Sequence, residues 1–158
     1  MNLSKIFKNA LLIMLASLVL TACATKKVQN QMQGDVYTGT DTVKYLASGV
    51  ADRVFFATNE SVLTTASRDT LRKQAEWLRK NSKINVVLEG HADERGTREY
   101  NLALGERRAN AAKDYLMTYG ISSNRISVIS YGKERPVNSG SNPLAWSQNR
   151  RAVTVKTN

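Results

Sequence analysis

The chain has 158 residues, of which 42% are apolar, 23% are charged and only two are prolines. This length offers one domain with little left over, and this composition excludes a chain that is disordered throughout and a membrane protein with several spans. The formal net charge of +10 favours an anionic partner such as nucleic acid, anionic lipid or an acidic polymer.

Residues 1–22 have the three-part layout of a secretory signal peptide. Lys5 and Lys8 form a short basic region, and a nearly unbroken apolar run covers residues 11–20. That run is too short to span a bilayer comfortably, because a span needs roughly 20 residues. Removal of the signal lowers the net charge from +10 to +8 through the loss of the two lysines. Export also sets nucleic acid aside as a partner.

Cys23 is the only cysteine of the chain, so it cannot form an internal disulfide. Leu20-Thr21-Ala22-Cys23 resembles the bacterial lipobox, in which the cysteine becomes the acylated first residue of the mature protein. The resemblance implies a diacylglycerol and an amide-linked acyl chain on Cys23, and two or more such chains hold a protein stably to a bilayer. The next residue is Ala24 and not the aspartate of inner-membrane retention, so we expect the outer membrane. An incidental cysteine in a signal peptide or membrane anchor is the alternative.

Residues 24–49 are polar and have no apolar stripe with which to bury a core. The expected organisation is therefore an acylated N-terminus and flexible tether over residues 23–50, followed by a folded domain over residues 51–158. A coil of this length has a root-mean-square span of roughly 30 Å and a stretched reach of roughly 85 Å. Residues 43–46 are expected to add a short helical turn.

After the tether, patterns typical of strands alternate with patterns typical of helices. The expected strands cover residues 54–56, 84–89, 126–131 and 152–155. The expected helices cover residues 64–80 and 98–119, and the second is stopped by Gly120. The alternation predicts an α/β two-layer sandwich, in which helices pack on one face of a mixed sheet of about four strands. Residues 138–143 are expected to form a loop.

Each predicted helix has an apolar face that would contact the sheet. In the first helix this face consists of Leu71, Ala75 and Leu78, with Trp77 beside them. In the second helix the stripe includes small residues that permit a close approach to the sheet, and it consists of Leu102, Gly105, Ala109, Ala112 and Leu116. Trp77 and Trp146 are expected to be packing residues, with exposure in a mobile loop as the alternative for Trp146.

A run of polar residues, 90–97, lies where the second strand gives way to the second helix. Thr97 is the expected N-cap of that helix. Asn101 and Arg108 are two helical turns apart, so they lie in nearly one line about 10 Å apart along the helix axis. Together with Asp93 they offer both charge signs, which suits a zwitterion with an ammonium and a carboxylate group. Spacing alone leaves open the alternative that Asp93 and Arg108 form a structural ion pair.

The same stretch resembles the OmpA-like domain and, more narrowly, the peptidoglycan-associated lipoproteins. The resemblance is carried by residues 90–97 together with Asn101, Leu102, Leu104 and Arg107-Arg108-Ala109. It extends over about residues 52–156, including residues 130–136 and 149–153, and the lipobox matches the lipoprotein branch independently.

The resemblance implies non-covalent binding of the meso-diaminopimelate in the peptidoglycan stem peptide. The aspartate and arginine that grip this group fall on Asp93 and Arg108, and the supporting asparagine falls on Asn101. The loop after the first strand is implied to contribute mainly through its backbone at Phe56 and Ala57, although many relatives have an aspartate at the latter position. The remaining implied contacts are His91 and Leu102.

The resemblance also implies a tether between outer membrane and cell wall, as part of a Tol-Pal type system that supports envelope integrity and constriction at division. A TolB-like periplasmic protein is the implied partner, over a surface that includes Glu94 and Arg95, and a TolA-like protein is a further one. No cofactor is implied.

Three functions compete on the residues alone: a wall-binding module, an enzyme that acts on the wall, and a scaffold that captures other envelope proteins. His91, Asp93 and Glu94 invite a metal or acid–base reading. However, a single histidine excludes a three-histidine zinc site, and we expect His91 to be a structural hydrogen-bonder. No nucleophile–base pair or pair of catalytic carboxylates is recognisable, which disfavours an enzyme. Arg150 and Arg151 are expected to hold the last strand by ion pairs, with a ligand role as the alternative.

Overall fold

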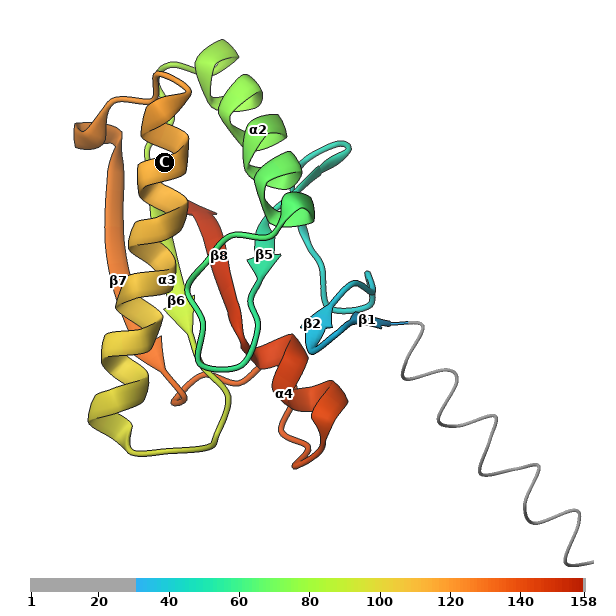
Figure 1. Cartoon of the computed structure of the whole chain (residues 1–158). Coiled ribbons are helices and arrows are strands. Elements are labelled where there is room, and N and C mark those ends of the chain that lie inside the picture. Colours follow the sequence, from blue (N-terminus) through green and yellow to red (C-terminus); the bar gives the residue numbers. More distant parts are fainter. Residues whose placement is uncertain (1–30, 158) are drawn as a thin grey trace, which may run out of the picture.

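The computed structural model describes residues 31–157 (Figure 1). The predicted signal peptide and the predicted acylation site at Cys23 lie outside these residues. No helix within residues 31–157 combines the length and the apolar character that crossing a membrane requires.

A four-stranded mixed sheet forms the centre of the described residues. Its strands, in spatial order, are β5 (Arg53–Phe55), β8 (Arg151–Lys156), β6 (Val86–His91) and β7 (Ile126–Gly132). β8 runs antiparallel to both of its neighbours, whereas β6 and β7 are parallel. A parallel pair needs a long crossover, which α3 (Arg98–Thr118) supplies, with the 3-10 turn Ser123–Arg125 leading into β7.

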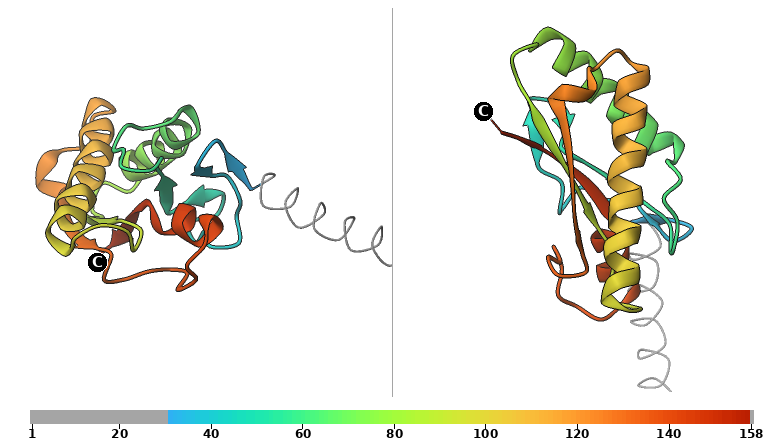
Figure 2. Two further views of the ribbon diagram at one scale, coloured as in Figure 1. Left: turned by 60° about the horizontal axis from the view of Figure 1, so that its bottom comes forward. Right: turned by 90° about the vertical axis from the view of Figure 1, so that its left-hand side faces the viewer.

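The two long helices, α2 (Thr65–Lys80) and α3, lie on one face of this sheet (Figures 1 and 2). The predicted two-layer sandwich is therefore confirmed. Thr64 caps α2 by accepting from the Ser67 N–H at 3.1 Å, and Thr97 caps α3 by accepting from the Tyr100 N–H at 3.2 Å. The predicted face of α2 is buried, and Trp77 packs against the core as expected.

Two glycines bring α3 into close contact with the sheet. A Cβ added to Gly90 in β6 would lie 1.8 Å from the carbonyl oxygen of Gly105 in α3. Four members of the predicted stripe of α3 are buried, but Leu102 is only partly buried and Leu104 is buried in its place. The close approach fixes the first turns of α3 beside the end of β6, where the predicted polar run begins.

Residues 31–51 are not the flexible tether that the sequence predicts; they form an ordered strap along the domain. This N-terminal strap (residues 31–51) contains two small hairpins, made by β1 (Met32–Gln33) with β2 (Val36–Tyr37) and by β3 (Tyr45–Ala47) with β4 (Val50–Ala51). The expected helical turn over 43–46 is wrong, because β3 begins there.

Two isolated apolar side chains attach the strap to the domain. Tyr37 and Leu46 are buried, and the Tyr37 ring meets the Phe55 ring edge-on with centroids 4.8 Å apart. Gly34 and Gly49 have positive φ, which allows the two tight hairpin turns. Since two apolar residues nine positions apart make no periodic pattern, the sequence gives no sign of this packing.

A short helix, α4 (Pro143–Asn149), follows the predicted loop over residues 138–143 and precedes β8. Asn142 caps it by accepting from the Ala145 N–H at 3.0 Å, and Pro143 lies in its first turn. Figure 1 shows α4 at the same end of the molecule as the strap's first hairpin, and α4 contacts β2.

Candidate ligand-binding site

One end of the sheet collects most of the polar loops. β5, β6 and β7 run in the same direction, so their C-terminal ends meet at one edge, together with the start of β8. We call this edge the loop end; it comprises residues 56–64, residues 91–97, residues 132–142, α4 and Arg150. Figure 2 shows it turned toward the viewer on the left.

Asp93 lies at the loop end with only 7% of its surface exposed. Its carboxylate accepts hydrogen bonds from the Arg95 guanidinium at 2.7 Å, from the Arg95 backbone N–H at 3.1 Å and from the Arg150 guanidinium at 3.2 Å. Burial alone would raise the pKa of Asp93, but the bonds from Arg95 and Arg150 lower it below its ordinary value. Asp93 is therefore a carboxylate at neutral pH.

Arg108 is completely buried, and its hydrogen bonds go to carbonyl oxygens. It donates to Glu60 at 2.8 Å, to His91 at 2.8 Å and to Ala57 at 3.0 Å. Burial, and then the charge of Arg150, lower its pKa to about 10, so the guanidinium is still protonated at neutral pH. The direct ion pair with Asp93, left open by the sequence, is not formed.

The environment of Arg108 favours an anion. Three of its five N–H groups are used, and within residues 31–157 no carboxylate hydrogen-bonds to it. The charge of Arg150 acts on Arg108 more strongly than the charge of Asp93 does, which leaves a local excess of positive charge at this buried cation. A carboxylate that reached the two remaining N–H groups would neutralise it.

The contacts that Arg150 makes at the loop end were not predicted from the sequence. It donates to the Phe56 carbonyl oxygen at 3.1 Å as well as to Asp93, and it is 3% exposed. The expected ion pair exists for Arg150, but its partner is 57 residues away on the β6–α3 loop. Arg151 departs from the expectation, since its hydrogen bonds go to the Asn149 and Arg135 carbonyl oxygens. The only indication of these contacts in the sequence is the run Asn149-Arg150-Arg151 at the start of the last strand.

The other predicted contacts have mostly supporting roles in the structure. Asn101 is buried and donates to the Arg95 carbonyl oxygen at 2.8 Å, which fixes the loop that carries Asp93. The Phe56 N–H donates to the Arg150 carbonyl oxygen at 2.9 Å, so it is not a free donor for a ligand. The Ala57 carbonyl oxygen accepts from Arg108, and the Leu102 carbonyl oxygen accepts from the Ser130 hydroxyl at 2.6 Å.

His91 does not act through its ring as the structural hydrogen-bonder that we expected. Both ring nitrogens are buried without a hydrogen-bond partner among the described residues, and Nε2 is 3.7 Å from the Glu89 carboxylate. Burial, followed by the positive charge of Arg151, lowers the pKa of His91 to about 3. Its ring is therefore neutral, and its part in the loop end is the carbonyl oxygen that Arg108 contacts.

Glu94 and Arg95, the predicted partner surface, are exposed and meet Trp146 of α4. The Trp146 indole N–H donates to Glu94 at 2.8 Å, the Ser141 hydroxyl donates to Glu94 at 3.1 Å, and the Arg95 guanidinium stacks 4.4 Å from the Trp146 ring centroid. Hydrogen bonds from Trp146 and then Ser141 lower the pKa of Glu94. Trp146 is thus a polar contact residue and not the packing residue that we expected.

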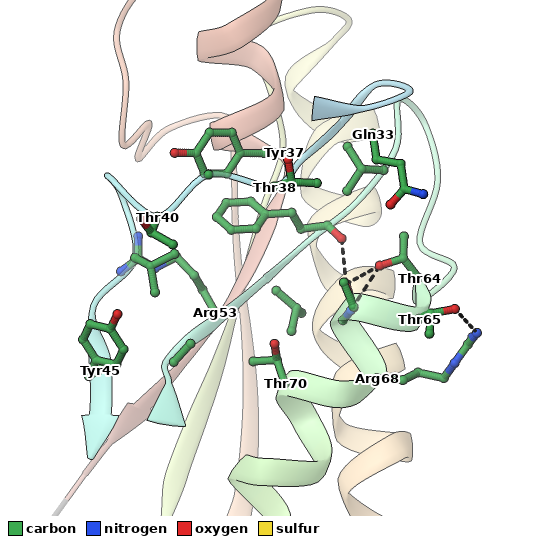
Figure 3. Close-up of a pocket in the computed structure, with 18 residues that line it drawn as sticks. Gln33, Tyr37, Thr38, Thr40, Tyr45, Arg53, Thr64, Thr65, Arg68 and Thr70 are labelled. Atoms are coloured by element: carbon green, nitrogen blue, oxygen red, sulfur yellow. Dashed lines mark hydrogen bonds between the residues drawn. The ribbon is translucent and has the colours of Figure 1, made fainter. Parts of the chain in front are cut away.

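A cavity of about 580 Å³ lies between the strap, β5 and α2 (Figure 3). Its lining includes Tyr37, Arg53 and Thr65, and none of the predicted contact residues Asp93, Asn101 and Arg108. Within residues 31–157, no group of three or more histidine, cysteine or acidic side chains is placed to hold a metal ion.

Comparisons with known proteins agree with this architecture. Residues 55–150 match the model of the OmpA family. A peptidoglycan-associated lipoprotein of Mesorhizobium japonicum is 44% identical over 160 residues, covering 98% of this chain and 95% of the relative. One from Brucella melitensis is 46% identical over 144 residues, covering 88% and 86% respectively. These names describe an association with peptidoglycan and no reaction.

Comparison with solved structures also identifies this fold. The crystal structure of the peptidoglycan-associated lipoprotein from Burkholderia pseudomallei has a TM-score of 0.65 and 35% identity, covering 67% of this chain and 90% of that one. The C-terminal domain of Helicobacter pylori MotB, at 18% identity and a TM-score of 0.63 over 68% of this chain and 84% of that one, shares the fold. The chain belongs to the OmpA family and, within it, to the peptidoglycan-associated lipoproteins.

Proposed function

We propose that the chain binds peptidoglycan non-covalently at the loop end and, through an acylated Cys23, tethers the outer membrane to the cell wall without catalysing a reaction. The observation that carries this proposal is that Asp93 and Arg108 lie at the same end of the sheet without pairing with each other. The names and identities of the relatives support the same role.

The chemistry of the loop end fits the diaminopimelate of the stem peptide, which carries an ammonium and a carboxylate on one carbon. The Asp93 carboxylate would accept from the ammonium, and the two unused N–H groups of Arg108 would donate to the carboxylate. Both side chains are buried, so the ligand enters as the Ala57–Glu60 loop moves away from Arg108.

A second function, capture of protein partners, is favoured by the cluster of Glu94, Arg95 and Trp146. Tryptophan and arginine are residue types enriched at the centres of protein interfaces, and here an exposed Arg95 stacks on a half-buried Trp146. We propose this cluster as the contact for a TolB-like periplasmic protein, with a TolA-like protein as a further partner, in a Tol-Pal type system that acts in envelope integrity and constriction at division.

Co-sedimentation of residues 24–158, the mature chain without its acylated first residue, with diaminopimelate-containing sacculi tests wall binding. Asp93→Ala and Arg108→Lys should lower the affinity at least tenfold, because losing one partner of a desolvated charged contact costs about 2–5 kcal/mol. Asp69→Ala and Arg72→Lys are matched controls, since these residues form an exposed ion pair on α2 and should leave pelleting unchanged.

Circular dichroism and urea unfolding identify variants that do not fold. Equal pelleting of the wild type and folded Asp93→Ala would show that Asp93 is structural, and the proposed site would be wrong. If the wild type itself stays in the supernatant, the proposal that the chain binds the wall is wrong. A pull-down with a TolB-like protein, comparing the wild type with Glu94→Ala, then tests the scaffold role.

A further inference from the structure

The tip of the strap's first hairpin reaches the loop end. Asp35 lies in the turn between β1 and β2, directly after Gly34, whose φ of 65° allows that turn. Its carboxylate accepts from the Thr58 backbone N–H at 2.6 Å and lies 3.9 Å from the Arg150 guanidinium. Arg150 also donates to the Asp35 carbonyl oxygen.

These contacts are the ones that a bound carboxylate makes. A backbone N–H and a guanidinium together form a charge-assisted receptor for a carboxylate. The receptor is joined directly to the proposed site, because the other side of the same Arg150 guanidinium donates to Asp93, and Thr58 follows Ala57, the acceptor of Arg108. Burial alone would raise the pKa of Asp35, but the hydrogen bonds from Thr58 and the charge of Arg150 lower it, so this side chain is ionised.

Asp35 is also placed where an incoming ligand would meet it. Its side chain is 48% exposed, compared with 8% for Asp93 and 3% for Arg150. An anion approaching from solvent therefore reaches the Asp35 position before it reaches Asp93 or Arg108.

The strap is held by few contacts close to Asp35. β1 and β2 are two residues long, Tyr37 packs on Phe55, and Asp41 accepts from Gln148 at 3.1 Å. Segments with so few buried apolar contacts open locally at low free-energy cost, whereas the sheet and α3 do not. The tip is thus able to leave while the rest of the site stays folded.

We propose that Asp35 is a built-in competitor of the wall ligand: it occupies the carboxylate position formed by the Thr58 N–H and the Arg150 guanidinium, and a ligand carboxylate displaces it. This inference rests on the proposed function, since it concerns access to the same site. The strap then sets the affinity of the site for the wall. Any interaction that detaches the strap from the loop end raises that affinity.

Calorimetric titration of the mature chain with a soluble stem tripeptide that ends in meso-diaminopimelate tests the competition. Asp35→Asn keeps the size of the side chain and removes its charge, so we expect the dissociation constant to fall roughly three- to tenfold, which is the reciprocal of an open fraction of about one third to one tenth in the wild type. Asp69→Asn is the matched control, because it makes the same charge change at an exposed position of α2 that has no contact with the strap, and it should leave the dissociation constant unchanged.

Hydrogen exchange of the wild type gives a second readout. Addition of the tripeptide should speed exchange in residues 31–38 while it slows exchange at the Thr58 amide. If Asp35→Asn binds equally or more weakly, or if the strap becomes better protected with ligand, Asp35 organises the site and the competitor is disproved. If neither the wild type nor any variant binds the tripeptide, both the proposed diaminopimelate site and the proposed competition by Asp35 are wrong. The sacculi experiment then shows separately whether the chain binds the wall.

Discussion

At the scale of single residues, the loop end separates Asp93 and Arg108, for which spacing alone left open a structural ion pair. Asp93 is bound by Arg95 and Arg150, while Arg108 is bound by three carbonyl oxygens. A carboxylate and a guanidinium that already neutralised each other would have little to offer a zwitterion. Arg108 has no carboxylate among its hydrogen-bond partners, whereas Asp93 is paired with Arg95 and Arg150 and would exchange one of these bonds for the ammonium of a ligand.

His91 allows a clean test of linkage, because it is the only histidine of the chain. Its pKa of about 3 in the folded state lies below the ordinary 6.5, so between these pH values the unfolded state binds a proton that the folded state does not. The free energy of unfolding should therefore fall as the pH drops from 6.5 toward 3, by up to about 1.4 kcal/mol per pH unit from this group.

His91→Phe should remove this part of the acid sensitivity. Urea unfolding at several pH values between 7 and 4 measures the free energy of unfolding of both proteins. The titration of the carboxylates contributes equally to both, so the difference between the two curves reports on His91. Parallel curves for wild type and His91→Phe would mean that His91 is protonated in the folded state.

At the scale of elements, the close contact between α3 and β6 positions the site. Gly105→Ala would normally stabilise a helix by about 1 kcal/mol through propensity. In this helix the new Cβ would lie 2.4 Å from the Ser130 hydroxyl and 2.8 Å from the Gly90 carbonyl oxygen. We expect Gly105→Ala to destabilise the protein by about 1–3 kcal/mol, because a well-packed contact must separate.

Urea unfolding measures the difference, and Ala103→Gly at an exposed position of the same helix calibrates the propensity effect. A stabilised Gly105→Ala protein would show that α3 can move away from β6 without cost, and that the contact does not fix the loop end.

The elements also show what the sequence can and cannot predict. The sheet strands and the two long helices were predicted to within about two residues, because their apolar residues recur with the periods of 2 and 3.6 that buried faces impose. The short helix α4 has no such stripe, although the Asn142-Pro143 pair is a helix-start signal that could have revealed it. The strap buries only two apolar side chains, Tyr37 and Leu46, so its sequence predicts a flexible tether.

The proximity of the candidate residues could be predicted where chain neighbours determine it. The strand–helix junction and the helical spacing predict that Asp93, Asn101 and Arg108 lie near one another, and the structure brings their segments together at the loop end, while their role in ligand binding stays a prediction. Arg150 and Asp35 reach that end only through the tertiary fold, from 57 and 58 residues away from Asp93 along the chain. Spacing arguments cannot find such contacts.

At the scale of the whole molecule, the proposed membrane anchor at Cys23 and the proposed wall-binding site at the loop end lie in separate parts of the chain. Cys23→Ser should move the protein from the membrane fraction to the soluble fraction of fractionated cells, since acyl chains are the expected anchor. The released protein should still pellet with purified sacculi, because the loop end is unaffected. Retention of the variant in the membrane fraction after washing would mean that another segment provides the anchor.

The docked strap also determines how the molecule bears mechanical load. With the strap in place, only eight residue steps separate Cys23 from Gln31, a reach of at most about 28 Å; with the strap detached up to Asp52, the reach rises to about 100 Å. Under the two proposed attachments, a pull between membrane and wall would act first on the two-residue strands at the start of the strap, and not on the sheet. Because that pull withdraws Asp35 from Arg150, the tether would lengthen and grip the wall more tightly under tension, which is the behaviour of a catch bond.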